Sequence, residues 1–322
     1  MSSGTNKTAG KVMFIDTVHP ELWKRLTKMG FKCSDYTSAT QAQILSQISD
    51  FQGIVIRSKF TIDQNLLDKA RKLEFIARSG SGLENIDLNY AKTKNIICFN
   101  SPEGNRDAVA EHCVGMLLTL FNKINIADQE VKKGKWEREQ NRGVELKGKT
   151  IGLIGYGCMA EAFAQRLAGF NVNVIAYDCN RTNFSSSIVK EVTIEELKTQ
   201  SDIVSLHVNY TENNYHLVNE SFIKSFKKPF YLINTSRGKC VNTRAVIDGI
   251  KSKKILGACL DVLEMESSAF QKSTDEQQLK LLNELSSFNE VILTPHVAGW
   301  TKESHVKLST VLADKIQAHY LL

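Results

Sequence analysis

The chain has 322 residues, of which 42% are apolar and 24% charged, a composition typical of a soluble protein of about two domains. Its net charge of +6 is spread along the sequence without a Lys/Arg block, which argues against nucleic-acid binding and is compatible with small anionic substrates. Residues 1–10 lack the apolar core of a signal peptide, and the longest apolar stretch, residues 114–121, is too short to cross a bilayer. We therefore expect a cytoplasmic protein without a membrane partner.

The seven cysteines are odd in number and show neither a C-x-x-C pair nor metal-like spacing. This usage predicts reduced thiols and no metal site. Cys158 lies inside a glycine turn, where it is interpreted as a small, tolerated residue, with sensitivity to oxidation as the alternative.

The first hundred residues alternate strand-like apolar runs with helical spacing, which is typical of an α/β domain with a parallel sheet. No glycine triplet occurs among them, so this half is predicted to bind something other than a dinucleotide. Residues 100–105 carry Asn, Ser, Pro and Gly and mark a boundary. Strands are expected at 12–15, 31–36, 53–56, 73–77 and 96–99, and helices at 20–29, 42–48 and 62–70.

Two helices are expected after this boundary. Residues 107–121 form a long apolar pattern, which we interpret as packing between domains or subunits and not as a ligand site. Residues 123–135 form a more polar helical pattern that ends near Gly134.

The stretch 150–178 predicts a mononucleotide-binding βαβ unit, because a strand, a glycine turn, a helix and a second strand ending in Asp178 follow one another. The helix N-terminus favours phosphate charge. Asp178 suits the adenosine ribose hydroxyls and repels a 2′-phosphate, so NAD is favoured over NADP, although Arg181 moderates that preference. The alternative is an ordinary strand-to-helix turn. The candidate cofactor-binding residues of the turn are Gly155, Gly157, Cys158 and Met159.

The alternation resumes beyond Asp178. Arg237, Asp261 and His296 each follow the end of an expected strand. Ligands of open α/β sheets bind outside the carboxyl ends of the strands, so one crevice is expected to collect these three side chains. Strands are expected at 202–208, 230–233, 256–262 and 291–293, and helices starting at 194 and covering 220–226, 243–250 and 306–316.

Three stretches together resemble the D-isomer-specific 2-hydroxyacid dehydrogenase family. They are the glycine turn with Asp178, the turn Asn234-Thr-Ser-Arg237-Gly238, and residues 260–266 followed by Leu293-Thr-Pro-His296. The resemblance implies an α/β fold of two doubly wound parallel-sheet domains. In this fold a Rossmann-type NAD-binding domain, residues 102–294, is inserted into a flavodoxin-like substrate-binding domain, residues 1–101 and 295–322. It also implies a homodimer.

The resemblance implies catalytic roles for three residues. His296 corresponds to the acid/base that exchanges a proton with the substrate oxygen, since imidazole titrates near working pH. Glu266 corresponds to its acidic partner, with Glu264 as a weaker competing assignment. Arg237 corresponds to the clamp on the substrate carboxylate. The chain departs from the family pattern at Ser267, where proline is usual, and at Leu263, where phenylalanine is common.

The remaining implied site residues surround the nicotinamide and the substrate. Asp261 corresponds to the acceptor for the carboxamide, and Thr235 flanks the ring. Ser79 and Gly80 belong to a glycine-rich turn whose backbone N–H groups could bind the substrate carboxylate.

Arg57 and Arg78 resemble basic residues of the branch that oxidises 3-phosphoglycerate. The expected activity is therefore NAD-dependent oxidation of 3-phospho-D-glycerate to 3-phosphooxypyruvate, the first step of serine synthesis. Alternatives are a glyoxylate, hydroxypyruvate or other 2-ketoacid reductase, and, in another class, an NAD-sensing corepressor-like binding protein. Because the chain ends soon after its closing helix, we expect no C-terminal regulatory domain and no serine feedback through one.

Overall fold

The computed structural model describes residues 10–266 and 276–321 of the chain. The chain forms two compact units, residues 1–105 with 300–322 and residues 106–299. The sequence places the boundaries after residues 101 and 294, and the assignment of substrate to one unit and cofactor to the other stays a prediction. Ser267 lies outside the described residues.

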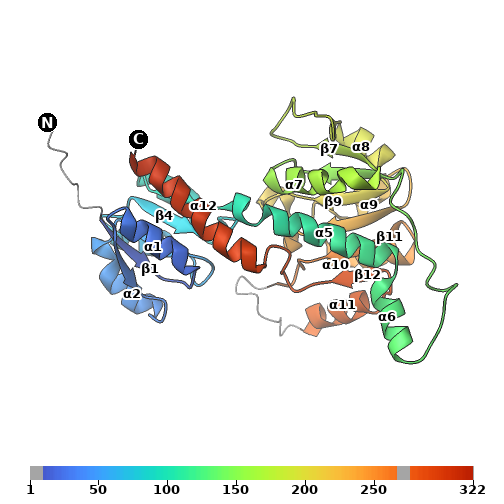
Figure 1. Cartoon of the computed structure of the whole chain (residues 1–322), viewed down its shortest axis with the longest axis horizontal. Coiled ribbons are helices and arrows are strands. Elements are labelled where there is room, and N and C mark those ends of the chain that lie inside the picture. The colour runs from blue at the N-terminus through green and yellow to red at the C-terminus, as the bar shows by residue number, and fades with distance from the viewer. Residues whose placement is uncertain (1–9, 267–275, 322) are drawn as a thin grey trace. The chain divides into compact units, whose positions relative to one another are not determined.

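The first unit is built on a five-stranded parallel sheet with strand order β2-β1-β3-β4-β5. Apolar side chains on the two faces of the sheet form two cores, one under α2, α3 and α4 and the other under α1 and α12 (Figure 1). The central strands are therefore buried on both faces, as parallel sheets require. The elements are β1 (Lys11–Phe14), α1 (Pro20–Lys28), β2 (Lys32–Asp35), α2 (Gln41–Gln47), β3 (Gly53–Ile56), α3 (Gln64–Lys69), β4 (Phe75–Arg78), α4 (Leu88–Thr93), β5 (Ile97–Phe99) and α12 (Lys302–Leu321).

The second unit is built on a seven-stranded parallel sheet with strand order β12-β11-β10-β9-β6-β7-β8. Helices α5 and α7 pack against each other over one core, and α8, α9 and α10 cover the other (Figure 1). The chain order reverses between β6 and β9, which is the switch point where such sheets bind dinucleotides. The predicted fold class, two doubly wound parallel-sheet domains, is confirmed. The strands of this sheet are β6 (Thr150–Ile154), β7 (Asn173–Tyr177), β8 (Lys190–Glu191), β9 (Ile203–Leu206), β10 (Phe230–Asn234), β11 (Ile255–Leu260) and β12 (Val291–Leu293).

The helices of the second unit follow the sequence pattern with a few additions. Helix α5 belongs to the buried core of this unit. Three elements were not predicted from the sequence: helix α4 of the first unit, and strand β8 and helix α11 of the second. Both α4 and β8 are short, and α11 buries only Leu285. The helices are α5 (Arg106–Phe121), α6 (Ile124–Lys132), α7 (Cys158–Leu167), α8 (Ile194–Gln200), α9 (Glu220–Ser225), α10 (Thr243–Lys251) and α11 (Glu276–Ser286).

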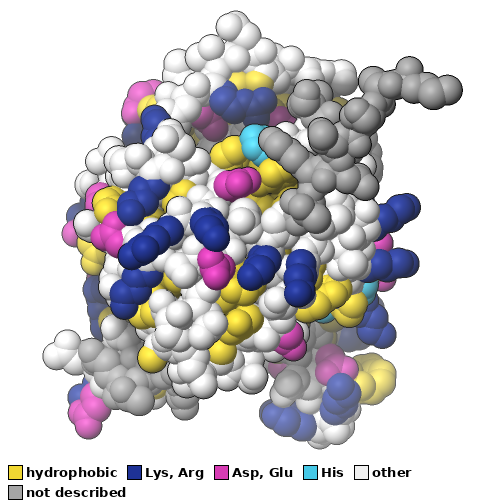
Figure 2. Space-filling model, turned by 90° about the vertical axis from the view of Figure 1, so that its left-hand side faces the viewer, with side chains coloured by type: hydrophobic (Ala, Val, Ile, Leu, Met, Phe, Trp, Pro, Cys, Tyr) yellow, Lys and Arg dark blue, Asp and Glu magenta, His cyan; other side chains and the backbone are white. Residues whose placement is uncertain are grey.

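The distribution of charges on the surface and the state of the cysteines both agree with what the composition predicts. On the face shown in Figure 2, several Lys and Arg side chains lie among Asp, Glu and apolar side chains. All seven cysteines lie in the described part of the chain, and none of them is in a disulfide bond. Within the described residues, none of the helices has the length and apolar character needed to cross a membrane.

His207 directly follows β9 at the switch point. Its imidazole packs against Phe163, and its Nε2 lies 2.9 Å from the Ser205 hydroxyl. Burial lowers the pKa of His207 from 6.5 to about 4, since the charged form loses its hydration. Between pH 6.5 and about 4, the folded protein therefore keeps this side chain neutral, whereas the unfolded chain takes up a proton.

We expect acidification to destabilise the fold through His207. The stabilisation is fully present above pH 6.5 and is lost as the pH falls toward 4, by up to about 3 kcal/mol. His207→Gln keeps a hydrogen-bonding amide and cannot titrate, so its free energy of unfolding should fall less between pH 7 and 4.5 in urea denaturation. His319→Gln, at an exposed position, should behave like the wild type. Equal pH dependence in His207→Gln and the wild type would contradict this account.

Candidate active site

Three neighbouring strands of the second sheet carry the predicted catalytic and nicotinamide residues. Arg237 follows β10, Asp261 follows β11 and His296 follows β12, and these strands are adjacent in the order β12-β11-β10. Because all three run parallel, their carboxyl ends meet at one edge of the sheet. The structure therefore brings the three segments together, as the sequence predicts.

His296 and Glu266 form a direct pair in this edge. Nδ1 of His296 lies 2.8 Å from Oε2 of Glu266, and both side chains are about one-third exposed or less. The other carboxylate oxygen, Oε1, accepts the backbone N–H of Leu263 at 2.5 Å. A carboxylate accepts only, so Nδ1 carries the proton and Nε2 is left to exchange one with a ligand.

Asp261 holds the loop that presents His296. Its side chain is 1% exposed. Oδ1 accepts the Thr294 hydroxyl at 2.6 Å and the Val297 N–H at 2.9 Å, and Oδ2 accepts the Ala298 N–H at 2.9 Å. The backbone N–H of His296 also donates to the Asp261 carbonyl at 2.8 Å. Asp261 thus organises the His296 loop, and its predicted contact with the nicotinamide stays a prediction.

His296 itself has a left-handed backbone, with φ of 56°. A non-glycine residue in this region costs about 1 kcal/mol or more. The bonds from Asp261 to the residues on both sides of His296 offset that cost.

Glu264, the competing acid, faces a different histidine. Its Oε1 lies 2.5 Å from Nε2 of His216, and its Oε2 accepts the Thr243 N–H at 3.0 Å. In the structure it is Glu266 and not Glu264 that pairs with His296.

The other predicted site residues near β10 lie on the loop that follows this strand. Arg237 donates from Nη1 to the Ser236 carbonyl at 2.7 Å. The Thr235 hydroxyl lies 3.3 Å from Sγ of Cys113, a thiol whose pKa burial raises to about 12. Asn234 shapes the turn, because its side chain accepts from Ser236 and donates to the Arg237 carbonyl.

The glycine turn joins β6 to α7. Gly155 has φ of 84°, and a Cβ there would lie 2.6 Å from the His207 carbonyl, so only glycine fits without distortion. Gly157 caps α7, and apart from its neighbours in the chain no described residue comes within 4 Å of the position its Cβ would take. This leaves the first N–H groups of the helix accessible to a pyrophosphate, so the turn fits a dinucleotide. Cys158 begins the helix, and Met159 packs on the adjoining core.

Asp178 lies directly after β7 beside this turn. Its carboxylate accepts three backbone N–H groups, those of Tyr156 at 2.7 Å, Asn180 at 2.8 Å and Arg181 at 3.0 Å. Partial burial would raise the pKa of Asp178, but these three donors outweigh it and hold the pKa below its usual value. The carboxylate is therefore charged at neutral pH.

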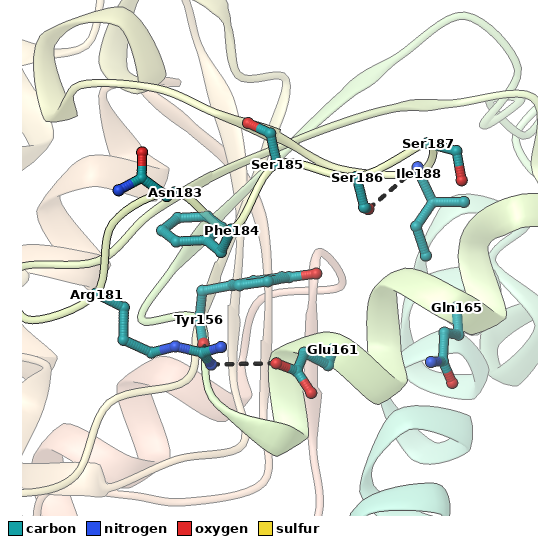
Figure 3. Close-up of a pocket in the computed structure, with 10 residues that line it drawn as sticks. All are labelled: Tyr156, Glu161, Gln165, Arg181, Asn183, Phe184, Ser185, Ser186, Ser187 and Ile188. Atoms are coloured by element: carbon teal, nitrogen blue, oxygen red, sulfur yellow. Dashed lines mark hydrogen bonds and ion pairs between the residues drawn. The ribbon is translucent and has the colours of Figure 1, made fainter.

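Arg181 binds both the glycine turn and the helix α7 that follows it. Its guanidinium donates to the Tyr156 carbonyl and pairs with Glu161 at 3.1 Å. The Phe184 ring stacks on the Tyr156 ring at 4.6 Å. Figure 3 shows these side chains among the residues that line a pocket of about 450 Å³, with Gln165 on the same helix as Glu161.

The predicted substrate residues lie together in the first unit, at the carboxyl ends of the neighbouring strands β3 and β4. Nε of Arg78 donates to the Arg57 carbonyl at 3.1 Å, and the Arg57 guanidinium lies 4.8 Å from the centre of the Trp300 ring. Ser79 is buried and donates its N–H to Ile56. Gly80 has φ of 156°, and a Cβ there would overlap the Arg78 guanidinium.

A model of the D-isomer specific 2-hydroxyacid dehydrogenase NAD binding domain matches residues 114–298. D-3-phosphoglycerate dehydrogenase of Archaeoglobus fulgidus is 32% identical over 308 residues, 95% of this chain. This chain belongs to the D-isomer-specific 2-hydroxyacid dehydrogenase family. It spans only 56% of the length of the Archaeoglobus protein.

Other proteins are similar to this chain over more of their own length. Hydroxypyruvate reductase of Thermotoga maritima is 34% identical over 274 residues, covering 85% of this chain and 86% of the relative. The solved structure of D-lactate dehydrogenase from Aquifex aeolicus, complexed with NAD and lactic acid, superposes with a TM-score of 0.80 at 28% identity. That match covers 97% of this chain and 95% of the other. The residues that the NAD binding domain model of the family matches, 114–298, lie within the second unit.

Several polar residues of the site were missed from the sequence. Nε2 of His112 lies 3.0 Å from the Thr294 hydroxyl, although the sequence pattern of α5 predicts only apolar packing. Asp16 follows β1, and one of its oxygens accepts the backbone N–H groups of Arg57, Ser58 and Lys59. Its position after a strand, next to the strand that precedes Arg57, was the signal that could have identified it.

We expect Asp261→Asn to destabilise the second unit. The amide group would face the Ala298 N–H or the Val297 N–H, so one buried donor would lose its acceptor, at a cost of about 1–3 kcal/mol. Chemical denaturation measures the change. Asp248→Asn, more than half exposed, should stay within about 0.5 kcal/mol of the wild type. An unchanged free energy of unfolding in Asp261→Asn would show that its hydrogen bonds do not hold the loop.

Proposed function

We propose that this chain is an NAD-dependent dehydrogenase that oxidises 3-phospho-D-glycerate to 3-phosphooxypyruvate. The observation that carries the proposal is the hydrogen bond of 2.8 Å between Nδ1 of His296 and Glu266, at the edge of the sheet that also bears the glycine turn. This pair supplies a general base whose ring is fixed in one tautomer, which removal of a hydroxyl proton requires.

The side chains have distinct tasks in this reaction. Nε2 of His296 takes the hydroxyl proton, while Glu266 stabilises the imidazolium that forms. Arg237 binds the substrate carboxylate and polarises the reacting oxygen. When bound, the nicotinamide accepts the hydride. The turn residues Gly155, Gly157, Cys158 and Met159, together with Asp178, Thr235 and Asp261, would hold that cofactor.

The phosphate assignment rests on the first unit. Arg57 and Arg78 lie at adjacent strand ends, and the Arg78 guanidinium donates to the Arg57 backbone carbonyl. The backbone N–H of Gly80 would add a donor for the substrate anion, whereas the N–H of Ser79 is bonded to the Ile56 carbonyl. Reduction of hydroxypyruvate or glyoxylate is the second candidate, favoured by the similarity to the Thermotoga hydroxypyruvate reductase. It needs the same catalytic residues and no phosphate site.

We expect Arg57→Ala and Arg78→Ala each to raise the KM for 3-phosphoglycerate at least tenfold, because a charged hydrogen bond to phosphate is lost. Steady-state rates with phosphohydroxypyruvate, hydroxypyruvate and glyoxylate, measured with both NAD(H) and NADP(H), test the assignment. The matched control is Arg71→Ala, an exposed arginine of the same unit. Faster turnover of hydroxypyruvate than of its phosphate ester, or an unchanged KM in both variants, would establish the second candidate.

The cofactor preference has its own test. Glu161 and the Tyr156 carbonyl hold the Arg181 guanidinium, which keeps it from a 2′-phosphate. We expect Glu161→Gln to raise the ratio of kcat/KM for NADP over that for NAD about two- to fivefold, the magnitude of an exposed ion pair. The double variant with Arg181→Ala should lose this gain. A gain that persists without Arg181, or none in Glu161→Gln, would contradict the explanation.

We also propose a homodimer formed through the second unit. Residues 124–144 expose large apolar side chains, among them Ile124, Val131 and Trp136, the last 75% exposed. We expect light scattering to give twice the chain mass of 36.1 kDa for the wild type and a lower mass for Trp136→Lys. Leu88→Lys, at an exposed leucine of the first unit, is the control and should stay dimeric. A monomeric wild type would refute the dimer.

A further inference from the structure

A second histidine–carboxylate pair lies in the same unit as the catalytic residues and has no role in the proposed reaction. Nε2 of His216 lies 2.5 Å from Oε1 of Glu264. The side chains are 22% and 27% exposed. The Tyr215 ring stacks on the imidazole at 3.9 Å, so the ring is held on one face as well as at both nitrogens.

The hydrogen bonds around this pair fix its protonation. Asn242 caps α10 by accepting the Ala245 N–H at its Oδ1, so its amide nitrogen faces Nδ1 of His216 at 3.2 Å. An amide nitrogen only donates, so Nδ1 accepts and Nε2 carries the proton donated to Glu264. The other oxygen of Glu264 accepts the Thr243 N–H at 3.0 Å. Both carboxylate oxygens are therefore occupied, and each faces a donor.

His216 connects two segments that carry catalytic residues. Its backbone N–H donates to the Lys239 carbonyl at 3.0 Å, two residues after Arg237. Its side chain bonds to Glu264, two residues before Glu266. The backbone of His216 has φ of 49°, an unfavourable left-handed conformation that this double attachment offsets.

The two segments also touch directly. A Cβ on Gly238 would overlap the carbonyl oxygen of Leu263, so glycine is needed for this approach. Leu263 in turn closes a tight turn with Glu266 through two hydrogen bonds, one to the Glu266 backbone and one to its carboxylate. A displacement of Glu264 would therefore move Glu266 relative to Arg237.

The geometry points to His216 and Glu264 as positioning residues for the catalytic set. Together they fasten the segment bearing Glu266 to the segment bearing Arg237, so that the carboxylate that steadies His296 keeps its place beside the substrate clamp. Neither residue exchanges a proton with the substrate. This inference rests on the proposed function, since it assigns Arg237, Glu266 and His296 to one reaction.

The test compares three variants of the full chain. His216→Leu removes both hydrogen bonds of the ring, whereas His216→Gln retains an amide donor for Glu264. Glu264→Gln keeps the shape but turns an amide donor toward either His216 or the Thr243 N–H, so one bond is lost. The readouts are kcat and KM for NAD with the best substrate of the acid panel, and the low-field proton resonance of His296 Nδ1–H, assigned by its loss in His296→Gln.

We expect His216→Leu and Glu264→Gln to lower kcat about 10- to 100-fold with KM for NAD within about twofold of the wild type, as a small misplacement of catalytic groups does. His216→Gln should recover kcat to within about threefold. The low-field resonance should shift or vanish in the first two variants and persist in the third. If His216→Leu does not fold, the isosteric Glu264→Gln decides.

Two results would overturn the inference. One is wild-type kcat with an unmoved resonance in both His216→Leu and Glu264→Gln. The other is an equal loss in His216→Gln and His216→Leu, which would indicate a merely structural histidine. A wild-type chain that turns over no member of the acid panel would refute the proposed function instead. The resonance alone then decides whether His216 and Glu264 position the pair of Glu266 with His296.

Discussion

The site depends on the hydrogen bond between Nδ1 of His296 and Oε2 of Glu266, which fixes which imidazole nitrogen faces a ligand. The bond joins segments that follow β12 and β11, and the parallel register of those strands brings the segments to one edge. The second oxygen of Glu266 is bound by the Leu263 N–H, so the carboxylate cannot rotate without losing a bond. The geometry of the acid–base pair thus depends on the pairing of β11 with β12.

Buried and half-buried carboxylates hold this arrangement in place. Asp261, which is almost fully buried, binds the loop on both sides of His296. Glu264 lies on the segment that carries Glu266 and fastens it to His216 and Thr243. Each of these two carboxylates has both oxygens occupied by donors, which is the condition for burying a charge at tolerable cost. The first unit contains a similar arrangement. One oxygen of Asp16 accepts three consecutive N–H groups of the loop that begins at Arg57.

The sequence predicted the fold well where its patterns were regular. Residues 53–56 and 291–293 form strands with the bounds expected from their apolar runs. The short helix α4 has too few apolar residues to show a period, although Asp87 caps it. Helix α11 is absent from the predicted elements, although its leucines lie three and four residues apart, a spacing typical of a helix.

The sequence predicted only part of the site, because side-chain directions and contacts between distant residues are not encoded in local patterns. Residue type and motif indicated that His296 and Glu266 belong together, and the structure places them in contact. Spacing along the chain could not reveal that the Asp261 side chain turns inward and binds the His296 loop. Its contact with the nicotinamide stays a prediction. The contacts of His112 with Thr294 and of His216 with Glu264 join residues far apart in sequence, which no local pattern encodes.

The central claim is that His296, steadied by Glu266, exchanges the substrate proton. The most direct measurement is the single-turnover rate of NADH oxidation after rapid mixing of the NADH-loaded protein with a 2-keto acid, compared between the wild type and His296→Gln. The account predicts a rate lowered about 10²- to 10⁴-fold with NADH affinity retained. A rate within about twofold of the wild type would contradict it.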